Sequence, residues 1–149
     1  MIHGFDTSFL VAAEVAEHPD HDGVWRRLRE LKAKEDRFAL TALVLAELVH
    51  IVTDARRFKN PLTMPQALSE ARGWWEATDV EHVPPDDEAV NWFLAAMATH
   101  QLGRKRVLDT LLAATHRSAG ITSLLTLNAG DFAVFGEFTC LGAAAATAA

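Results

Sequence analysis

The stretch that decides the fold is residues 2–16, which reads IHGFDTSFLVAAEVA. Residues 2–5 form a short apolar run that ends at Asp6, and this pattern is typical of a buried strand. A helix follows at once, with Thr7 or Ser8 as its N-cap. A buried strand that leads directly into a helix indicates the beginning of a parallel βαβ unit.

The same alternation of short apolar runs and helical periodicity continues along the chain. We expect strands at residues 2–5, 38–40, 80–83, 121–126 and 138–141. We expect helices at residues 7–16, 24–32, 42–54, 63–77, 86–101 and 109–120. Short apolar strands that alternate with helices are typical of sheets buried on both faces. The predicted fold class is therefore α/β, a three-layer α/β/α sandwich with a short, mainly parallel central sheet.

Several of the expected helices begin with capping residues. Thr41 precedes one helix, and Thr63 forms a T-x-x-Q capping box with Gln66 at the start of another. Asp109 is predicted to open the helix 109–120 and to cap its free backbone amides. The helix that begins at Asp86 is predicted to bury an apolar face formed by Val90, Phe93, Leu94 and Met97.

Length and composition describe one ordinary globular domain. The chain has 149 residues, of which 50% are hydrophobic and 23% are charged. We place the domain at residues 1–141. The alanine-rich segment 142–149 has little to anchor it, and we expect it to be disordered.

Cysteine content and hydropathy limit the environment of the protein. Cys140 is the only cysteine, which excludes an intramolecular disulfide and a cysteine-rich zinc site. No stretch has the ~18 consecutive apolar residues of a membrane span, and the N-terminus lacks the basic region of a signal peptide. We therefore expect a cytoplasmic protein with no membrane contact. The net charge of −6 disfavours passive binding to nucleic acid, unless the acidic residues hold divalent cations.

Two acidic residues stand out by their position. Asp6 follows the first strand directly, and ligands of parallel α/β proteins collect at the carboxyl ends of strands. Its alternative role is that of a helix N-cap. Glu47 lies in the almost wholly apolar segment 42–54, where a carboxylate is costly unless it is paired or binds a metal. Its alternatives are pairing with an arginine or a solvated edge on the helix.

Three further polar residues lie near strand or helix ends. Asp109 is placed at a helix start, where the helix dipole keeps its carboxylate ionised. Asn128 and Asp131 follow the strand 121–126, although ordinary turn chemistry beside Gly130 also explains them. A parallel sheet would gather these oxygen atoms with those of Asp6 and Glu47 at one edge.

Carboxylates gathered in this way repel one another and require a cation to neutralise them. Hard oxygen ligands without cysteine favour Mg²⁺ or Mn²⁺ over zinc. Two such ions about 3.5–4 Å apart activate water and clamp a phosphodiester. The spacing of the acidic residues therefore indicates metal-dependent phosphoryl chemistry.

Four motifs, in this order, resemble the acidic motifs of PIN domains. They are residues 5–8 (FDTS), 46–48 (AEL), 108–114 (LDTLLAA) and 126–132 (TLNAGDF). The short chain looks most like the VapC-type toxins of bacterial toxin–antitoxin pairs. This resemblance implies a PIN-like fold, a Mg²⁺-dependent endoribonuclease and inhibition by a small antitoxin protein.

The resemblance also implies roles for individual residues. Metal would be held by Asp6, Glu47, Asp109 and Asp131. Asn128 stands where some members of the family carry an acid, so either Asn128 or Asp131 would complete the site. Ligands or phosphate would be oriented by the hydroxyl groups of Thr7, Ser8 and Thr126.

The resemblance further implies contacts with RNA and with other proteins. Two basic groups, Arg104–Arg106 and Arg56, Arg57 and Lys59, would steer RNA, although both are also typical of solvated surfaces. The four tryptophans are candidates for base stacking or for core packing. An antitoxin would cover apolar helices, and a homodimer is expected from the family.

Three other interpretations remain open. Asp6 would be phosphorylated in a phosphatase or receiver domain, but Ser8 stands where such phosphatases carry a second acid. A PIN-like fold would also serve as a non-catalytic interaction protein. A zinc module built on His18 and His21 lacks a third nearby ligand.

Overall fold

A computed structural model describes residues 1–146 of the chain and contains one parallel sheet. The sheet has five strands in the order β3-β2-β1-β4-β5, and every pairing is parallel. The strands are β1 (Ile2–Phe5), β2 (Arg37–Leu40), β3 (Val80–His82), β4 (Ser123–Leu125) and β5 (Thr139–Leu141). The five strands lie close to their predicted positions, and the sheet is wholly rather than mainly parallel.

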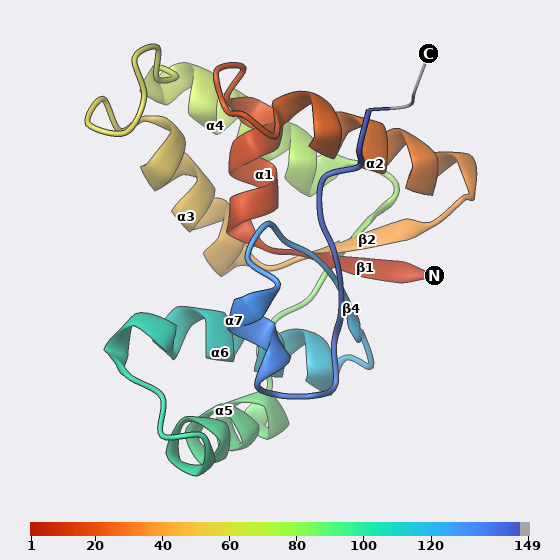
Figure 1. The fold of residues 1–149 in the computed structure, drawn as a ribbon, viewed down its shortest axis with the longest axis vertical. Coiled ribbons are helices and arrows are strands. Elements are labelled where there is room, and N and C mark those ends of the chain that lie inside the picture. The colour runs from red at the N-terminus through yellow and green to blue at the C-terminus, as the bar shows by residue number, and fades with distance from the viewer. Residues whose placement is uncertain (147–149) are drawn as a thin grey trace.

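Helices cover both faces of this sheet, as Figure 1 shows. The N-terminal group consists of α1 (Thr7–Glu14), α2 (His21–Ala33), α3 (Ala42–Val52) and α4 (Met64–Glu76). The other face carries α5 (Asp87–Thr99), the 3₁₀ turn η1 (Arg104–Arg106), α6 (Val107–Ser118) and α7 (Gly130–Ala133). The predicted three-layer α/β/α sandwich is therefore confirmed.

The centre of the core is β1, which is buried on both faces. Phe5 is fully buried and stacks on Phe38 of β2, with ring centroids 5.1 Å apart. On the opposite face, a Cβ atom on Gly4 would lie 2.7 Å from Nε2 of the buried His116. Glycine therefore lets α6 approach β1 closely. Because Asp109 lies two turns before His116 on the same side of α6, this contact directs Asp109 toward the carboxyl end of β1.

Most predicted helix starts are confirmed by their capping hydrogen bonds. The Thr41 side chain accepts from the Val44 amide, and Thr63 and Gln66 form the reciprocal capping box. The prediction for Asp109 is wrong in detail, because α6 begins at Val107 and Asp109 lies within its first turn. The 3₁₀ turn that runs directly into α6 moves the helix start toward the N-terminus.

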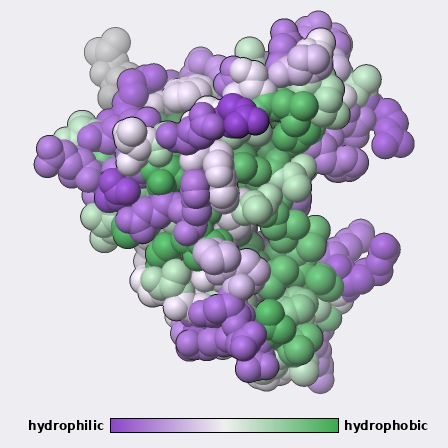
Figure 2. Space-filling model, turned by 180° about the vertical axis from the view of Figure 1, so that it is seen from behind, coloured by the Kyte–Doolittle hydropathy of each residue, from purple (hydrophilic) through white to green (hydrophobic). Residues whose placement is uncertain are grey.

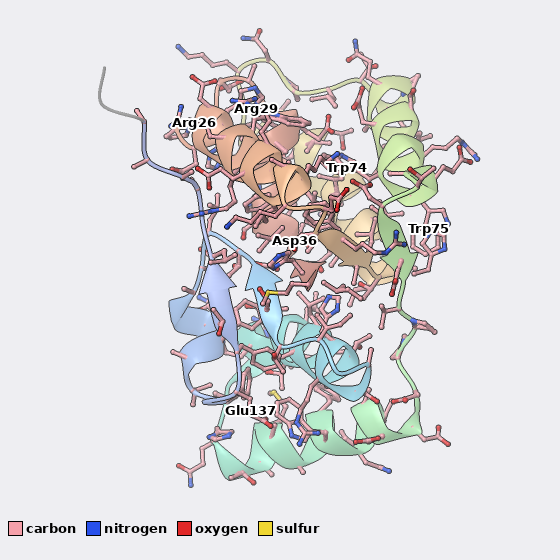
Figure 3. The ribbon with its side chains drawn as sticks, turned by 90° about the vertical axis from the view of Figure 1, so that its right-hand side faces the viewer. Arg26, Arg29, Asp36, Trp74, Trp75 and Glu137 are labelled. Atoms are coloured by element: carbon pink, nitrogen blue, oxygen red, sulfur yellow. The ribbon has the colours of Figure 1, made fainter. Side chains whose placement is uncertain are left out.

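The prediction that little anchors the alanine-rich segment is wrong for its first residues, which are hydrogen-bonded to α2. Arg26 of α2 donates to the Ala144 carbonyl at 3.1 Å, and Arg27 donates to the Gly142 carbonyl at 3.0 Å. The Ala144 amide in turn donates to the Gly23 carbonyl at 2.9 Å. Figure 3 shows Arg26 on the side of α2 that faces this segment. The part of the prediction that concerns residues 147–149 lies outside the described residues.

The surface keeps several large hydrophobic side chains exposed. Val90 and Leu94, which were predicted to face the core, are 42% and 59% exposed, and only Ala89 and Ala96 of α5 are buried. Figure 2 shows hydrophobic residues gathered along one side of the face seen from behind. None of the helices in residues 1–146 combines the length and the apolar character needed to cross a membrane.

The tryptophans serve mainly in packing. Trp25 and Trp74 stack with ring centroids 5.9 Å apart, and the Trp74 indole donates to Glu14 Oε1 at 2.6 Å. Trp92 contacts Phe135 edge to face at 5.2 Å. These contacts favour the core-packing alternative for the three residues.

Candidate active site

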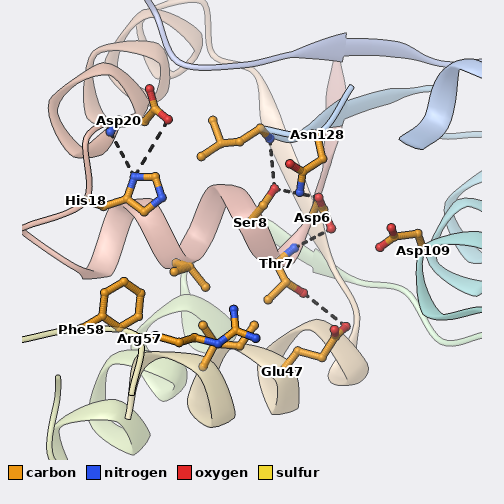
Figure 4. Close-up of a pocket in the computed structure, with 13 residues that line it drawn as sticks. Asp6, Thr7, Ser8, His18, Asp20, Glu47, Arg57, Phe58, Asp109 and Asn128 are labelled. Atoms are coloured by element: carbon orange, nitrogen blue, oxygen red, sulfur yellow. Dashed lines mark hydrogen bonds and ion pairs between the residues drawn. The ribbon is translucent and has the colours of Figure 1, made fainter. Parts of the chain in front are cut away.

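The candidate site lies where the strand order reverses, at the carboxyl ends of β1 and β4. The chain passes from β1 to β2 and β3 on one side of the sheet, and then crosses to β4 and β5 on the other. Crevices at such switch points are where open α/β sheets bind ligands. A cavity of about 630 Å³ opens there, and Figure 4 shows Asp6, Glu47 and Asp109 directed toward it from three different elements.

Asp6 is held in place by hydrogen bonds to both of its carboxylate oxygens. Oδ1 accepts from the Thr7 amide at 2.8 Å, so Asp6 is the N-cap of α1, and the prediction of Thr7 or Ser8 as this N-cap is wrong. Oδ2 accepts from Ser8 Oγ at 2.8 Å and from Thr126 Oγ1 at 2.6 Å. The side chain lines the cavity although the residue is only 5% exposed. The two alternative roles of Asp6 are thus compatible, since the cap also aims the carboxylate.

The turn after β4 is tied to the same carboxylate through hydroxyl groups. The Leu127 amide donates to Ser8 Oγ, and the Asn128 amide donates to Thr126 Oγ1, both at 3.0 Å. Asn128 lines the cavity beside Asp6. The structure therefore brings the predicted Ser8, Thr126 and Asn128 together around Asp6.

Glu47 lies on α3 at the wall of the cavity. Thr7 Oγ1 donates to Glu47 Oε1 at 3.3 Å, which connects α3 with the start of α1. The predicted alternative of a solvated edge on this helix is confirmed, because α3 buries only Val44, Leu48 and Val52. Glu47 therefore occupies a half-buried edge, and no ion pair within residues 1–146 joins it to an arginine.

Asp109 and Asp131 complete a group of four carboxylates, and the charges of the other three act on Asp109. Burial and the charges of Asp6, Asp131 and Glu47 raise the pKa of Asp109 to about 6. Burial, followed by the charge of Asp6, also raises the pKa of Glu47. Burial raises the pKa of Asp6, and hydrogen bonds from its neighbours oppose this rise while Asp131 adds to it. Negative charge is therefore concentrated at this edge of the sheet.

Arg106 is the member of the predicted basic triplet that reaches this group. Its Nη2 donates to the Asp131 carbonyl oxygen, and its charge lowers the pKa of Asp109. Its buried Nε has no hydrogen-bond partner among the described residues. Arg104 and Lys105 are exposed, so the structure separates them from Arg106.

The donor set fits a hard divalent cation, although the side chains are not drawn into a coordination shell. No three His, Cys, Asp or Glu side chains in residues 1–146 lie close enough to hold one ion as they stand. Carboxylates without a counter-ion repel one another, and this repulsion adds to burial in raising the pKa of Asp109. Carboxylate and amide oxygens are the ligands that Mg²⁺ and Mn²⁺ prefer.

The far end of the cavity contains residues that sequence reasoning did not combine. His18, Arg57 and Phe58 line it, and they come from the loops after α1 and α3. No periodic pattern links two such loops, so the sequence could not predict that these residues line one cavity. The zinc alternative loses support because the His21 ring is bonded to the Ala12 carbonyl at 2.8 Å. The Nδ1 atom of His18 accepts instead from the Asp20 amide.

Comparison with known proteins gives one family and several relatives. The model of the PIN domain family matches residues 5–137. Ribonuclease VapC24 of Mycobacterium tuberculosis is 31% identical over 136 residues, which span 88% of this chain and 89% of that protein.

Solved structures with a similar fold include VapC20 of Mycobacterium tuberculosis, described as a sarcin-ricin loop cleaving toxin. It has a TM-score of 0.70 and 22% identity, and the match covers 92% of this chain and 96% of that chain. VapBC2 from Rickettsia felis, bound to a DNA fragment from their promoter, has a TM-score of 0.67 and 22% identity. That match covers 96% of this chain and 99% of that chain.

Proposed function

The chain belongs to the PIN-domain family, and on that premise we propose that it is a metal-dependent endoribonuclease, the toxin of a toxin–antitoxin pair. The observation that carries this proposal is the convergence of four carboxylates at one edge of the sheet. Uncompensated acidic groups of this kind destabilise a fold, and they are typical of sites where a ligand supplies the missing charge. The mycobacterial relative is itself named a ribonuclease, which supports the choice of RNA.

Metal would be held by Asp6, Glu47, Asp109 and Asp131, with Asn128 as a further oxygen donor. When bound, Mg²⁺ or Mn²⁺ would supply Lewis-acid chemistry and an activated water for attack on a phosphodiester. The hydroxyl groups of Ser8 and Thr126 fix the orientation of Asp6, and Thr7 fixes that of Glu47. Oriented ligands lose less entropy on binding, so these hydroxyl groups act on metal affinity.

Arg106 has a separate role in this arrangement. Its guanidinium lies against the backbone of Asp131 and offsets part of the charge around Asp109. We assign it to holding α7 beside α6, and we leave contact with RNA to the exposed Arg104 and Lys105. The phosphoaspartate alternative is disfavoured, because Ser8 stands where such phosphatases carry a second acid, and its hydroxyl group donates to Asp6.

Protein partners follow from the family and from the exposed apolar surface. Leu68, Leu94 and Leu108 are each about half exposed, with exposed fractions of 54%, 59% and 46%. Figure 2 separately shows hydrophobic residues gathered along one side of the molecule, and such patches are typical of protein contacts. We propose that such surfaces bind a small antitoxin and a second copy of the chain, which light scattering of the purified protein would test.

The metal and the substrate are tested together on purified protein. Total RNA incubated with the protein and Mg²⁺ or Mn²⁺ should show defined new ends. No new ends should form in EDTA, and the same ends should return once metal is restored. Ends that persist in EDTA would contradict the metal requirement. Intact RNA under every metal condition would contradict the endoribonuclease and favour a non-catalytic member of the family.

A further inference from the structure

The cavity that contains the carboxylates extends beyond them to a second, differently composed end. We call this end the distal subsite and define it by His18, Arg57 and Phe58. Figure 4 shows these side chains on the far side of Thr7 and Ser8 from Asp109. One continuous cavity thus joins an acidic end to an end that offers a cation, an imidazole and an aromatic ring, with the Asp20 carboxylate beside the imidazole.

We propose that the distal subsite binds one nucleotide of single-stranded RNA that neighbours the cleaved phosphodiester. Phe58 stacks on the base, Arg57 binds the adjoining phosphate, and His18 donates a hydrogen bond to the nucleotide. This inference rests on the proposed function, because it concerns the substrate of the same cavity. It assigns a binding site rather than a catalytic one.

Phe58 has the placement of a stacking platform. It packs against the hydrophobic core with part of its surface and lines the cavity with the rest. A ring fixed in this way loses little entropy when a base stacks on it. Base–aromatic stacking tolerates every base, because each has a π-face. The subsite would therefore contribute affinity without strong sequence preference.

Arg57 supplies positive charge where the protein otherwise repels RNA. Its side chain is 61% exposed, and its Nε lies 3.6 Å from Asp54 Oδ2, a carboxylate that also pairs with Arg56. A single shared carboxylate leaves most guanidinium donors free to bind phosphate. In a chain of net charge −6, a cation on the wall of the cavity offsets the repulsion that the carboxylates exert on RNA.

His18 is oriented as a donor by its own loop. The Asp20 amide donates to Nδ1 of His18 at 3.1 Å, so Nδ1 carries a lone pair and the proton of a neutral ring is on Nε2. Nε2 is then the ring atom available to donate to an oxygen of the nucleotide. The charge of Arg57, the hydrogen-bond donor of His18 and the continuity of this end with the carboxylates favour RNA over a protein segment as the occupant.

The test measures binding separately from cleavage. A fluorescein-labelled single-stranded 12-nucleotide RNA is titrated with protein in the Asp6→Asn background, which keeps the RNA intact. Phe58→Ala and Phe58→Leu should each weaken binding about tenfold, and Phe58→Tyr should stay within about twofold of the parent. Arg57→Ala should weaken binding several-fold. The matched control is Arg72→Ala, which should leave RNA binding unchanged, since Arg72 is 76% exposed, pairs with Glu76 and does not line the cavity.

Phe58 also packs on the core, so stability must be separated from stacking. Phe58→Leu keeps an apolar side chain of similar size, and its Tm identifies any loss due to unfolding. An abasic ribose scanned along the RNA should weaken binding at one position about as much as Phe58→Ala does. Abasic RNA and Phe58→Ala together should then give no further loss, because both remove the same contact.

The outcomes distinguish this inference from the proposed function. Unchanged RNA binding in Phe58→Ala and Arg57→Ala would overturn the distal subsite even if the wild-type protein cleaves RNA. Binding that depends on Phe58 in a protein that never cleaves RNA would overturn the nuclease and leave the subsite. Variants that lose only the co-expressed antitoxin, and keep RNA binding, would assign the distal subsite to a protein segment and overturn the inference.

Discussion

The acidic residues at the two ends of β1 differ in whether a cationic partner balances their charge. At the amino end, the His3 ring lies 2.6 Å from Ser123 Oγ and 2.9 Å from Asp36 Oδ2. The N-terminal ammonium also donates to Asp36, at 3.2 Å. At the carboxyl end, Asp6 faces other carboxylates instead of a cation. Figure 3 shows Asp36 beside the strands, near the middle of that view.

The pKa values of Asp36 and Asp109 are shifted in opposite directions. Hydrogen bonding from His3, assisted by the N-terminal charge, lowers the pKa of Asp36. Burial and neighbouring carboxylates raise the pKa of Asp109 to about 6. A network with matched charges serves the fold by itself, whereas an unmatched one indicates a ligand that has to be supplied from outside. Acidic residues at the two ends of β1 are thus expected to differ in function.

The largest expected effect comes from exchanging one carboxylate at each end. Asp6→Asn should lower kcat for RNA cleavage by about 10³-fold or more, because several kcal/mol of metal-dependent stabilisation are lost. In metal-free buffer its Tm should stay equal or rise, since repulsion between carboxylates falls. Asp36→Asn should keep kcat within about twofold and lower Tm. Thermal melts and single-turnover cleavage measure the two quantities.

Similar behaviour of Asp6→Asn and Asp36→Asn would contradict a difference in function between the two ends of β1. Equal loss of Tm and retained cleavage in Asp6→Asn would make Asp6 a helix cap and nothing more. A folded Asp36→Asn protein that no longer cleaves RNA would place catalytic importance at the wrong end of β1.

Two hydroxyl groups at opposite ends of β4 provide a second comparison between the two ends of β1. Ser123 begins β4 and contacts His3, while Thr126 follows β4 and donates to Asp6 at 2.6 Å. Thr126→Val should lower activity or metal affinity about 10- to 100-fold, as is typical when a group that orients a metal ligand is removed. Ser123→Ala should leave activity unchanged and cost about 1 kcal/mol of stability. Mn²⁺ titration of both variants separates the two effects.

The fold and the identity of the acidic residues were predictable because both depend on local patterns. Short apolar strands, the Thr41 cap and the Thr63–Gln66 capping box all appear at the expected positions. Asp6 followed a strand in the sequence, and the rule that carboxyl ends of parallel strands share an edge placed it correctly. Whether these residues bind metal stays a prediction.

Features that depend on packing between distant segments were not predictable. Arg104, Lys105 and Arg106 are adjacent and alike in sequence, yet only Arg106 turns toward Asp131. The helix that carries Glu47 is apolar at every other position except His50, so periodicity could not show how much of its surface stays open. The distal subsite joins two loops whose contact depends on the packing of α1 against α3.

The smallest expected effect is an opposite pH dependence of stability at the two ends of β1. The pKa of Asp109 is raised from its ordinary value of 3.8 to about 6, so the folded state binds more protons than the unfolded state between these values. Stability in metal-free buffer should therefore fall as pH rises from about 4 to about 6, and stay level above. Since Asp109 is half exposed, screening limits this change to about 1 kcal/mol.

Asp36 has the opposite sign, because its pKa is lowered in the folded state. Its contribution is complete above the unfolded pKa near 4 and is lost as pH falls through the folded value. Melting curves at a series of pH values should show that Asp109→Asn removes the decline between about pH 4 and 6. Asp36→Asn should instead lower Tm above about pH 4 and converge with the parent in stronger acid. Saturating Mg²⁺ should abolish the Asp109 effect alone, and a slope that metal leaves unchanged would place Asp109 outside the metal site.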